Sequence, residues 1–387
     1  MKKPVPHLAA KNFEANLQRL YWLMRIGMAF ICILDRQIID IHVRFLFPAY
    51  QASFCFLYPI RSYIMSVFMS IPTTDTRLHF SNFPYLFSSL LLSSLLISGA
   101  AIAKEAPKKN KPAMADVIKA STAADWRALI PENTLYLELE KGRVVIELAP
   151  DFAPKHAINI RALVREGYYD GLAIVRSQDN YVAQWADPED ENPAKRREVK
   201  TARKNLDAEF TVKYAKELPF TRLPDVDGYA PQVGHANGFA AGRDPKTGTA
   251  WLAHCYGAVG VARGNESTSG DGTSLYVVTG HAPRQLDRNI TVVGRVMQGM
   301  ELLSSLPRGT GALGFYEKPE QMTAIKSLRI AADVPEAERS KLEVLRTDTA
   351  TFKAVVEAQR NRGGDWYKVA AGHIELCNVP LPVRVQK

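Results

Sequence analysis

The feature that most constrains this chain is a strand–turn–strand pattern at residues 168–187. A Tyr-Tyr-Asp-Gly turn leads into an apolar run that ends at Arg176, and an Asp-Asn turn leads into a second short run that carries Gln184. Two short apolar runs joined by turn residues predict a hairpin. The hairpin would bring Arg176, Tyr181 and Gln184 together on one surface. A planar cation, a ring and an amide in one place suggest recognition of a backbone amide.

The residues just before this hairpin predict a second hairpin followed by a helix. Apolar and polar side chains alternate over residues 134–140, a Lys-Gly turn follows, and a second apolar run ends at Leu148. This pattern is typical of two paired strands. Residues 157–166 then carry apolar side chains at helical spacing, and Gly167 is a typical helix terminator. The predicted order is therefore hairpin, helix, hairpin.

Composition and charge favour a globular protein that does not bind nucleic acid. Of 387 residues, 47% are apolar and 23% charged, which allows a sizeable core. The net charge is +9, but residues 1–103 hold nine Lys/Arg against four Asp/Glu, so the remainder carries 40 against 36, or +4. The nearest candidate for a basic patch is residues 195–204. We interpret it as a solvated face, because nucleic-acid binding requires a larger basic patch.

The first hundred residues differ from the rest and suggest export. Residues 83–98 are mainly apolar and are followed by small residues and an Ala-x-Ala pattern, the form of a signal peptide cleaved after Ala103. Met65 and Met69 lie at a suitable distance upstream, so residues 1–70 would be an over-extended gene start. The sequence thus predicts a periplasmic protein. A membrane anchor retained in the mature protein is the alternative, and only in that case would the protein contact a membrane.

The predicted organisation has five parts. They are a doubtful leader (1–70), a signal peptide (71–103), a linker or pre-domain segment (104–133), a main domain (134–332) with an insertion at 188–251, and a C-terminal extension (333–387). Order is expected to begin near Thr134. The insertion leaves the chain just after Gln184, so we expect it to border the site. Residues 335–362 show helical periodicity, including Leu342, Leu345 and Phe352.

Five motifs in order resemble the cyclophilin family of peptidyl-prolyl isomerases. They are the opening hairpin, the segment from Ala-Pro at 153–154 to the Arg176 hairpin, Gly-Ala-Val-Gly-Val-Ala-Arg at 257–263, Gly-Thr-Ser-Leu-Tyr-Val-Val-Thr at 272–279, and residues 285–300. The resemblance implies a mainly β fold: a closed eight-stranded antiparallel barrel capped by two helices, near residues 154–166 and 299–306. The long loop insertion and a C-terminal helical extension would be additions to this fold.

Isomerisation of an X-Pro bond requires a group that stabilises the twisted amide. Its barrier is about 18–20 kcal/mol, because the nitrogen lone pair is delocalised into the carbonyl. In the twisted state the nitrogen regains that lone pair and can accept a hydrogen bond. A guanidinium is permanently charged and donates rigidly. We therefore assign the catalytic role to Arg176 and expect Gln184 to hold the neighbouring carbonyl oxygen.

The resemblance also implies a surface for the substrate. Tyr181, Tyr276 and Leu286 would form the floor for the proline ring, Val182 and Ile290 its edge, and Ala262 and Arg263 the groove for the preceding residue. Ser274, Gln285 and Ile290 stand where the family has a second glutamine, a tryptophan and a histidine. These departures predict reduced activity and poor affinity for ciclosporin. Any of these side chains could instead be an ordinary ion-pair or core residue.

No metal or other cofactor is expected. The acidic runs at 187–191 and 225–228 lack the full ligand spacing of a calcium loop, and the Gly-rich run at 264–272 lacks the lysine of a phosphate loop. His254 and Cys255 are adjacent, which is no evidence of a nucleophilic dyad. After cleavage only Cys255 and Cys377 remain, and whether they pair in an oxidising compartment stays open.

Three functions remain in view. The first is a monomeric prolyl isomerase that acts on proline-containing polypeptides and assists the folding of exported proteins. The second is a binding module or chaperone of the same fold that holds proline-containing segments without useful turnover. The third is a membrane-anchored version, or an unrelated secreted hydrolase on a similar barrel.

Overall fold

The computed structural model describes residues 112–214, 218–363 and 366–386. All described residues belong to one compact unit within Ile102–Lys387. The predicted leader and signal peptide, including Ala103, therefore lie outside the described residues. Within the described ranges, no helix is both long and apolar enough to cross a membrane.

A closed antiparallel barrel of eight strands forms the centre of the described unit, as predicted. Its strands are joined in the order β11-β12-β5-β4-β14-β2-β3-β13. The bounds are β2 Thr134–Leu139, β3 Gly142–Leu148, β4 Ala173–Ser177, β5 Val182–Ala186, β11 Ala258–Val261, β12 Leu275–Val278, β13 Val292–Gln298 and β14 Thr323–Ile330. Because strand side chains alternate, one set fills the barrel and the other covers its outer surface.

Two helices cap the barrel core, which confirms both predicted helices. Helix α3 spans Pro154–Arg165 and has proline at its first position, where the missing N–H costs no intrahelical bond. Its residues Ala157, Ile160 and Leu163 are fully buried among the interior side chains of the strands. The short helix α4 spans Met300–Ser304 and buries Leu303 in the same core.

The insertion carries a sheet of its own rather than a long loop. Five strands pair in the order β6-β10-β9-β8-β7, with bounds β6 Val212–Lys213, β7 Thr221–Arg222, β8 Gln232–Ala236, β9 Phe239–Asp244 and β10 Thr249–Leu252. Ala250 and Leu252 belong to the apolar cluster on the outside of the barrel, whereas Trp251 belongs to a separate core. The sheet therefore has two buried faces, which the insertion's Gly- and Pro-rich sequence did not indicate.

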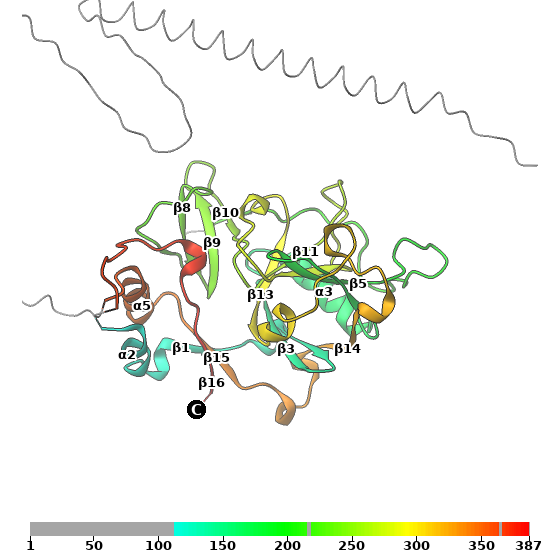
Figure 1. Ribbon diagram of the computed structural model, residues 1–387, viewed down its shortest axis with the longest axis horizontal. Helices are drawn as coiled ribbons and strands as arrows, with labels where there is room; N and C mark the ends of the chain where they lie inside the picture. Colours follow the sequence, from blue (N-terminus) through cyan, green and yellow to red (C-terminus); the bar gives the residue numbers. More distant parts are fainter. Residues whose placement is uncertain (1–111, 215–217, 364–365, 387) are drawn as a thin grey trace, which may run out of the picture. The chain divides into compact units, whose positions relative to one another are not determined.

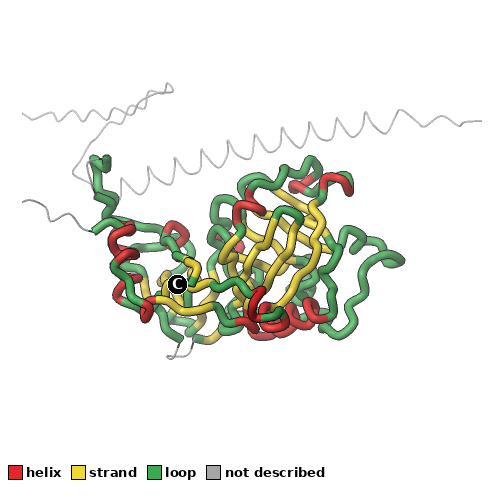
Figure 2. Tube along the Cα trace, turned by 90° about the horizontal axis from the view of Figure 1, so that it is seen from below, coloured by secondary structure: helices red, strands yellow, loops and turns green. Residues whose placement is uncertain are grey.

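A second lobe is built from segments at both ends of the described chain (Figures 1 and 2). It contains α2 Met114–Lys119, β1 Trp126–Ala128, β15 Leu342–Leu345, α5 Ala350–Arg360 and β16 Val383–Val385. The expectation that order begins near Thr134 is therefore wrong, since α2 and β1 precede it. A helix is present in the extension, but Leu342 and Leu345 lie in a strand that pairs with β1 and β16. Tertiary pairing overrides their helical spacing there.

A disulfide joins the segment between β10 and β11 to the C-terminal extension. Cys255 and Cys377 form a disulfide with a Cα–Cα distance of 5.0 Å and a sequence separation of 122 residues. Cys255 follows β10 and precedes β11, and Cys377 lies in the 3-10 turn Leu376–Asn378. The pairing that the sequence left open is therefore present, and Cys255 is not a free thiol.

Candidate active site

Strands β4 and β5 form the hairpin that the sequence pattern predicted. The backbone N–H of Gln178 donates to the carbonyl of Val182 at 2.9 Å, and Asn180 takes the left-handed conformation with φ 51°. Asparagine tolerates this conformation better than most side chains. The pairing shifts between Ile174 and Arg176, which is a bulge. Beyond the bulge, Arg176 lies directly opposite Gln184.

One row of residues crosses four neighbouring strands on the outside of the barrel. Arg176 on β4 is opposite Gln184 on β5, Gln184 is opposite Tyr276 on β12, and Tyr276 is opposite Gly260 on β11. Directly opposite residues share one face of a sheet. The intervening residues, such as Trp185 and Val277, belong to the barrel interior, so this row faces outward. We call it the Arg176 row.

The guanidinium of Arg176 is held by three hydrogen bonds. Its Nη1 donates to Oε1 of Gln184 at 3.1 Å, its Nε donates to the carbonyl of Leu313 at 2.7 Å, and its Nη2 donates to Oε1 of Gln178. The group also lies 5.6 Å from the ring centre of Tyr181. Burial lowers the pKa of Arg176 from its ordinary value. The cation is therefore oriented by several partners and partly removed from water.

The amide of Gln184 is oriented by neighbours on both sides. Its Oε1 accepts from Arg176, and its Nε2 donates to Oγ of Ser274 at 3.0 Å. Ser274, which stands in place of the family's second glutamine, is thus a partner of Gln184. An amide nitrogen has two N–H groups. The second N–H of Gln184 can therefore donate to a carbonyl oxygen outside the row.

Apolar side chains adjoin the Arg176 row, as the predicted proline floor requires. Val182 and Tyr276 are buried members of one apolar cluster, and Tyr181, Ala262 and Ile290 pack against that cluster at half burial. The cluster also contains Ala250 and Leu252 of the insertion sheet. The insertion therefore packs on the same outer face of the barrel as the predicted floor.

The remaining predicted residues lie in or near a 3-10 turn at Arg284–Leu286. Leu286 is half-buried there, whereas Gln285 is exposed. Arg263 is held by loop carbonyls: its Nε donates to Asn289 at 3.0 Å and its Nη1 to Gly264 at 2.8 Å. These contacts fix the Arg263 side chain along the loop.

The sequence did not predict two neighbours of the Arg176 row, the segment around Leu313 and the residue His254. The segment around Leu313 crosses Arg176: Phe315 forms an isolated bridge with Arg176, and its ring centre lies 5.3 Å from the guanidinium. Leu313 has φ 55°, and Gly314 approaches Gln178 so closely that a Cβ would lie 2.6 Å from its Cα. The glycines near Leu313 indicate a tight loop, but nothing in the sequence placed it beside Arg176.

The second missed residue is His254, which accompanies the pocket tyrosine. Its Nε2 lies 2.9 Å from Oη of Tyr276, and its Nδ1 lies 3.0 Å from Oδ1 of Asp287. Both His254 and Asp287 are buried. In the sequence, His254 stood out only as a possible base for a nucleophilic Cys255. The disulfide excludes that role, because Cys255 is not a free thiol.

The arrangement of the Arg176 row suits recognition of a polypeptide. Among the described residues, no group of three or more His, Cys, Asp or Glu side chains could hold a metal ion. The Arg176 row instead offers a fixed cation, a fixed amide and an adjoining apolar surface. These groups can bind an amide nitrogen, a carbonyl oxygen and an apolar ring, respectively.

Comparison with known proteins agrees with this geometry. The model of the family "Cyclophilin type peptidyl-prolyl cis-trans isomerase/CLD" matches residues 134–330. A "Probable peptidyl-prolyl cis-trans isomerase" of Brucella suis biovar 1 (strain 1330) is 30% identical over 209 residues, which cover 53% of this chain and 85% of that protein. A "Putative thylakoid lumen peptidyl-prolyl cis-trans isomerase" of Synechocystis is 25% identical over 211 residues, covering 50% of this chain and 51% of that protein.

A solved structure is similar over a larger part of the chain. The crystal structure of cyclophilin AquaCyp293 from Hirschia baltica has a TM-score of 0.54 and 27% sequence identity, and the match covers 68% of this chain and 94% of that one. Residues 134–330 are a smaller share of the chain than this. The structural match therefore extends beyond residues 134–330.

Proposed function

The chain belongs to the family of cyclophilin-type peptidyl-prolyl cis-trans isomerases, and we propose that the Arg176 row catalyses rotation about X-Pro bonds of exported polypeptides. The observation that carries this proposal is the row itself. Three hydrogen bonds fix the guanidinium of Arg176 beside the amide of Gln184, on the outer face of the barrel. The row adjoins apolar side chains that can seat a proline ring.

Arg176 would act on the nitrogen of the rotating bond. That nitrogen is a poor acceptor in the planar amide and a good one in the twisted state, so a donor placed there stabilises the transition state selectively. A guanidinium has five N–H groups, and three donate to Gln178, Gln184 and Leu313. The other two can donate to the substrate. No covalent bond breaks, and no proton transfer is required.

Gln184 and the aromatic residues would hold the substrate in place. The second N–H of the Gln184 amide can donate to the carbonyl oxygen next to the rotating bond. Tyr181 and Tyr276 would contact the proline ring, and Ala262 and Arg263 would line the groove for the residue before it. The insertion sheet packs into the same apolar cluster as Tyr276, which supports a role for the insertion at the border of the groove.

Two observations support export and a role in the folding of exported proteins. The bond between Cys255 and Cys377 is stable in oxidising compartments and rare in reducing ones. One relative carries a name that places it in the thylakoid lumen. N-terminal sequencing of the natively exported protein tests the predicted cleavage after Ala103, and a mature start upstream of Lys104 would favour the retained anchor instead.

The test of the activity is a protease-coupled assay with a short X-Pro peptide. Arg176→Ala is expected to lower kcat/KM about 10²–10³-fold, the range found when one transition-state donor is removed. The matched control is Arg346→Ala, because Arg346 pairs with Asp348 on the surface of the second lobe, away from the row. A loss of similar size in both variants would contradict the assignment of Arg176.

A binding module is the second candidate, and the changed pocket favours it. Ser274 and Gln285 replace two side chains that shape the family's pocket, and Gln285 is exposed rather than packed over the apolar surface. A wild-type protein that binds the X-Pro peptide without accelerating its isomerisation would support this function. Peptide affinity measured by calorimetry, beside the rate assay, separates the two.

A further inference from the structure

We propose that His254 is a positioning residue of the active site, which fixes the ring of Tyr276 against the barrel and so sets the floor of the proline pocket. The inference rests on the proposed function of the Arg176 row. It also assigns a task to the segments that exceed the barrel, since His254 follows the insertion sheet and adjoins the disulfide that holds the C-terminal extension.

The hydroxyl of Tyr276 needs a partner because it is buried. Only 4% of the Tyr276 side chain is exposed, and its Oη lies 2.9 Å from Nε2 of His254. The two ring planes are nearly parallel, with an interplanar angle of 12° and a centroid distance of 6.3 Å. A buried hydroxyl without a partner destabilises the folded state. The position of the ring is therefore coupled to the position of His254.

Gly260 lies against the hydroxyl end of the same ring. A Cβ on Gly260 would lie 2.3 Å from both Cζ and Oη of Tyr276, so the ring occupies the space that any other residue would fill. The hydroxyl end of Tyr276 thus contacts both the backbone of β11 and the side chain of His254. A phenylalanine in the same place could be held by packing alone, whereas the tyrosine requires an acceptor at its tip.

Asp287 fixes which nitrogen of His254 accepts. Its Oδ1 lies 3.0 Å from Nδ1 of His254 and accepts from the backbone N–H of His254 at 2.9 Å. Burial alone would raise the pKa of Asp287, but the hydrogen bonds from His254 and the charge of Arg284 lower it. The ionised carboxylate accepts from Nδ1–H. In the neutral ring, Nε2 is then the acceptor, and Tyr276 donates to it.

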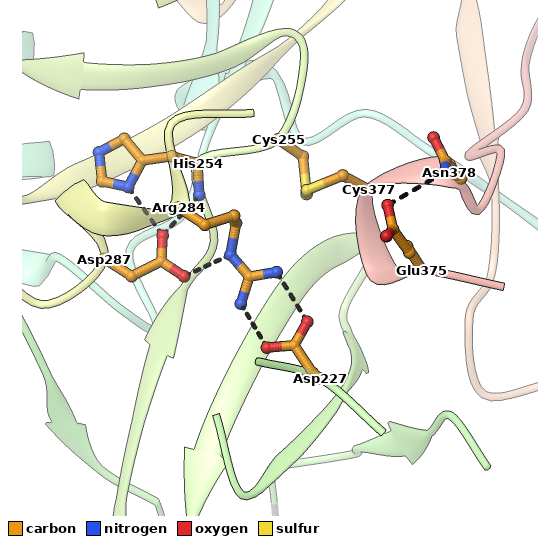
Figure 3. The surroundings of a disulfide bond; sticks show 8 residues. All are labelled: Asp227, His254, Cys255, Arg284, Asp287, Glu375, Cys377 and Asn378. Atoms are coloured by element: carbon orange, nitrogen blue, oxygen red, sulfur yellow. Dashed lines mark hydrogen bonds and ion pairs between the residues drawn. A yellow bond between two sulfur atoms is a disulfide. The ribbon is translucent and has the colours of Figure 1, made fainter. Parts of the chain in front are cut away.

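A further ion pair holds this carboxylate in place (Figure 3). Nε of Arg284 donates to Oδ2 of Asp287 at 2.6 Å, and the two Nη atoms donate to Asp227 at 3.0 and 3.1 Å. Asp227 belongs to the insertion, and Figure 3 shows the Cys255–Cys377 bond beside this group. A series of side-chain contacts therefore extends from Asp227 of the insertion through Arg284, Asp287 and His254 to the ring of Tyr276.

The experiment is a double-mutant cycle between His254 and Tyr276, read in the X-Pro assay. His254→Leu removes the acceptor and is expected to lower kcat/KM about 5–10-fold, mainly through a higher KM, because the ring contacts proline in the ground and transition states alike. In the Tyr276→Phe background the same substitution should change kcat/KM less than twofold, since no hydroxyl is left to orient. His254→Gln, which keeps an acceptor, should recover most of the loss.

The matched control is His235→Leu, at an equally buried histidine that makes no contact with the row. It should leave kcat/KM unchanged. Equal losses from His254→Leu in both Tyr276 backgrounds, or a lowered Tm with unchanged kcat/KM, would overturn the proposal in favour of a structural role.

The outcome also separates this inference from the proposed function. If the wild type shows no isomerase activity, the proposed function fails. The cycle is then read from the affinity for an Ala-Pro peptide, where the same pattern of coupling supports His254 and its absence overturns it. A wild type that neither accelerates isomerisation nor binds the peptide overturns both.

Discussion

Two histidines, His254 and His235, are both completely buried, yet their surroundings are opposite. Both ring nitrogens of His254 have partners, Asp287 and Tyr276. Neither ring nitrogen of His235 has a hydrogen-bond partner among the described residues. His235 lies on β8 of the insertion sheet, and its ring meets the edge of Phe352 on α5 with centroids 5.0 Å apart. One histidine belongs to a polar network, and the other is buried without a hydrogen-bond partner among the described residues.

The difference shows where this fold accepts an energetic cost. A buried polar group without a partner costs free energy, whereas a satisfied network can stabilise one arrangement of side chains. The network of His254 is complete and ends at a predicted substrate contact. The site of His235 has no such connection. Changes to the network of His254 should therefore affect both activity and stability, whereas changes at His235 should affect only stability.

The largest expected effect comes from breaking the network behind His254 at Asp287. Asp287→Ala removes the acceptor of His254 and one of the two carboxylates that pair with the buried Arg284. Removal of one partner from a buried ion pair typically costs about 3–5 kcal/mol, because the remaining charge is left uncompensated. The free energy of unfolding, measured in urea, should fall by this amount.

The control is Asp207→Ala, which removes an exposed partner of Lys155. Surface pairs are screened by water, so this substitution should produce no measurable change. A small effect of Asp287→Ala, similar to that of Asp207→Ala, would show that the network contributes little and would remove the contrast with His235.

The disulfide beside His254 should give the next largest effect. Opening the Cys255–Cys377 bond by Cys377→Ser frees a loop of more than a hundred residues, and loss of such a bond typically costs about 2–4 kcal/mol. Because Cys255 follows His254 directly, kcat/KM should fall together with stability. Thermal unfolding and the X-Pro assay, with and without a reducing agent, measure both. Reduction of the wild type should reproduce Cys377→Ser, and no change on reduction would contradict the prediction.

The sequence predicted those parts of the site that depend on neighbouring residues. Arg176 and Gln184 are eight residues apart, and their pairing follows from a turn and two short strands. The barrel and its two helices were implied by the resemblance of five ordered motifs to the cyclophilin family. The carbonyl of Leu313, by contrast, is 137 residues from Arg176 and lies in an irregular loop. No periodic pattern reports such a contact, because it depends on how the whole chain closes.

The added segments were harder to predict for a related reason. Leu342 and Leu345 have helical spacing with Phe352, but β1 and β16 provide strand partners that the local sequence does not reveal. The insertion sheet consists of short strands separated by glycine and proline, which resemble loops when considered alone. His254 attracted notice only as a neighbour of Cys255, because its partners Tyr276 and Asp287 are more than twenty residues away.

The smallest expected effect at neutral pH, and the one that isolates His235, is the pH dependence of stability. Burial, together with the positive charge of Arg295, lowers the pKa of His235 from 6.5 to about 3. The folded state therefore keeps His235 neutral where the unfolded chain binds a proton. Below about pH 6.5 the free energy of unfolding should fall by up to about 1.4 kcal/mol per pH unit from this group, until the pH reaches about 3.

His235→Leu should remove this contribution, because leucine has no proton to gain. At pH 7.5 the variant should be as stable as the wild type or slightly more stable, since an apolar side chain replaces a ring without partners. Urea unfolding of both proteins between pH 7.5 and pH 5 gives the difference directly, because the carboxylates titrate equally in the two. Parallel curves would mean that His235 takes up its proton as readily in the folded state as in the unfolded chain. It would then need a partner such as His254 has, and the two histidines would no longer differ in kind.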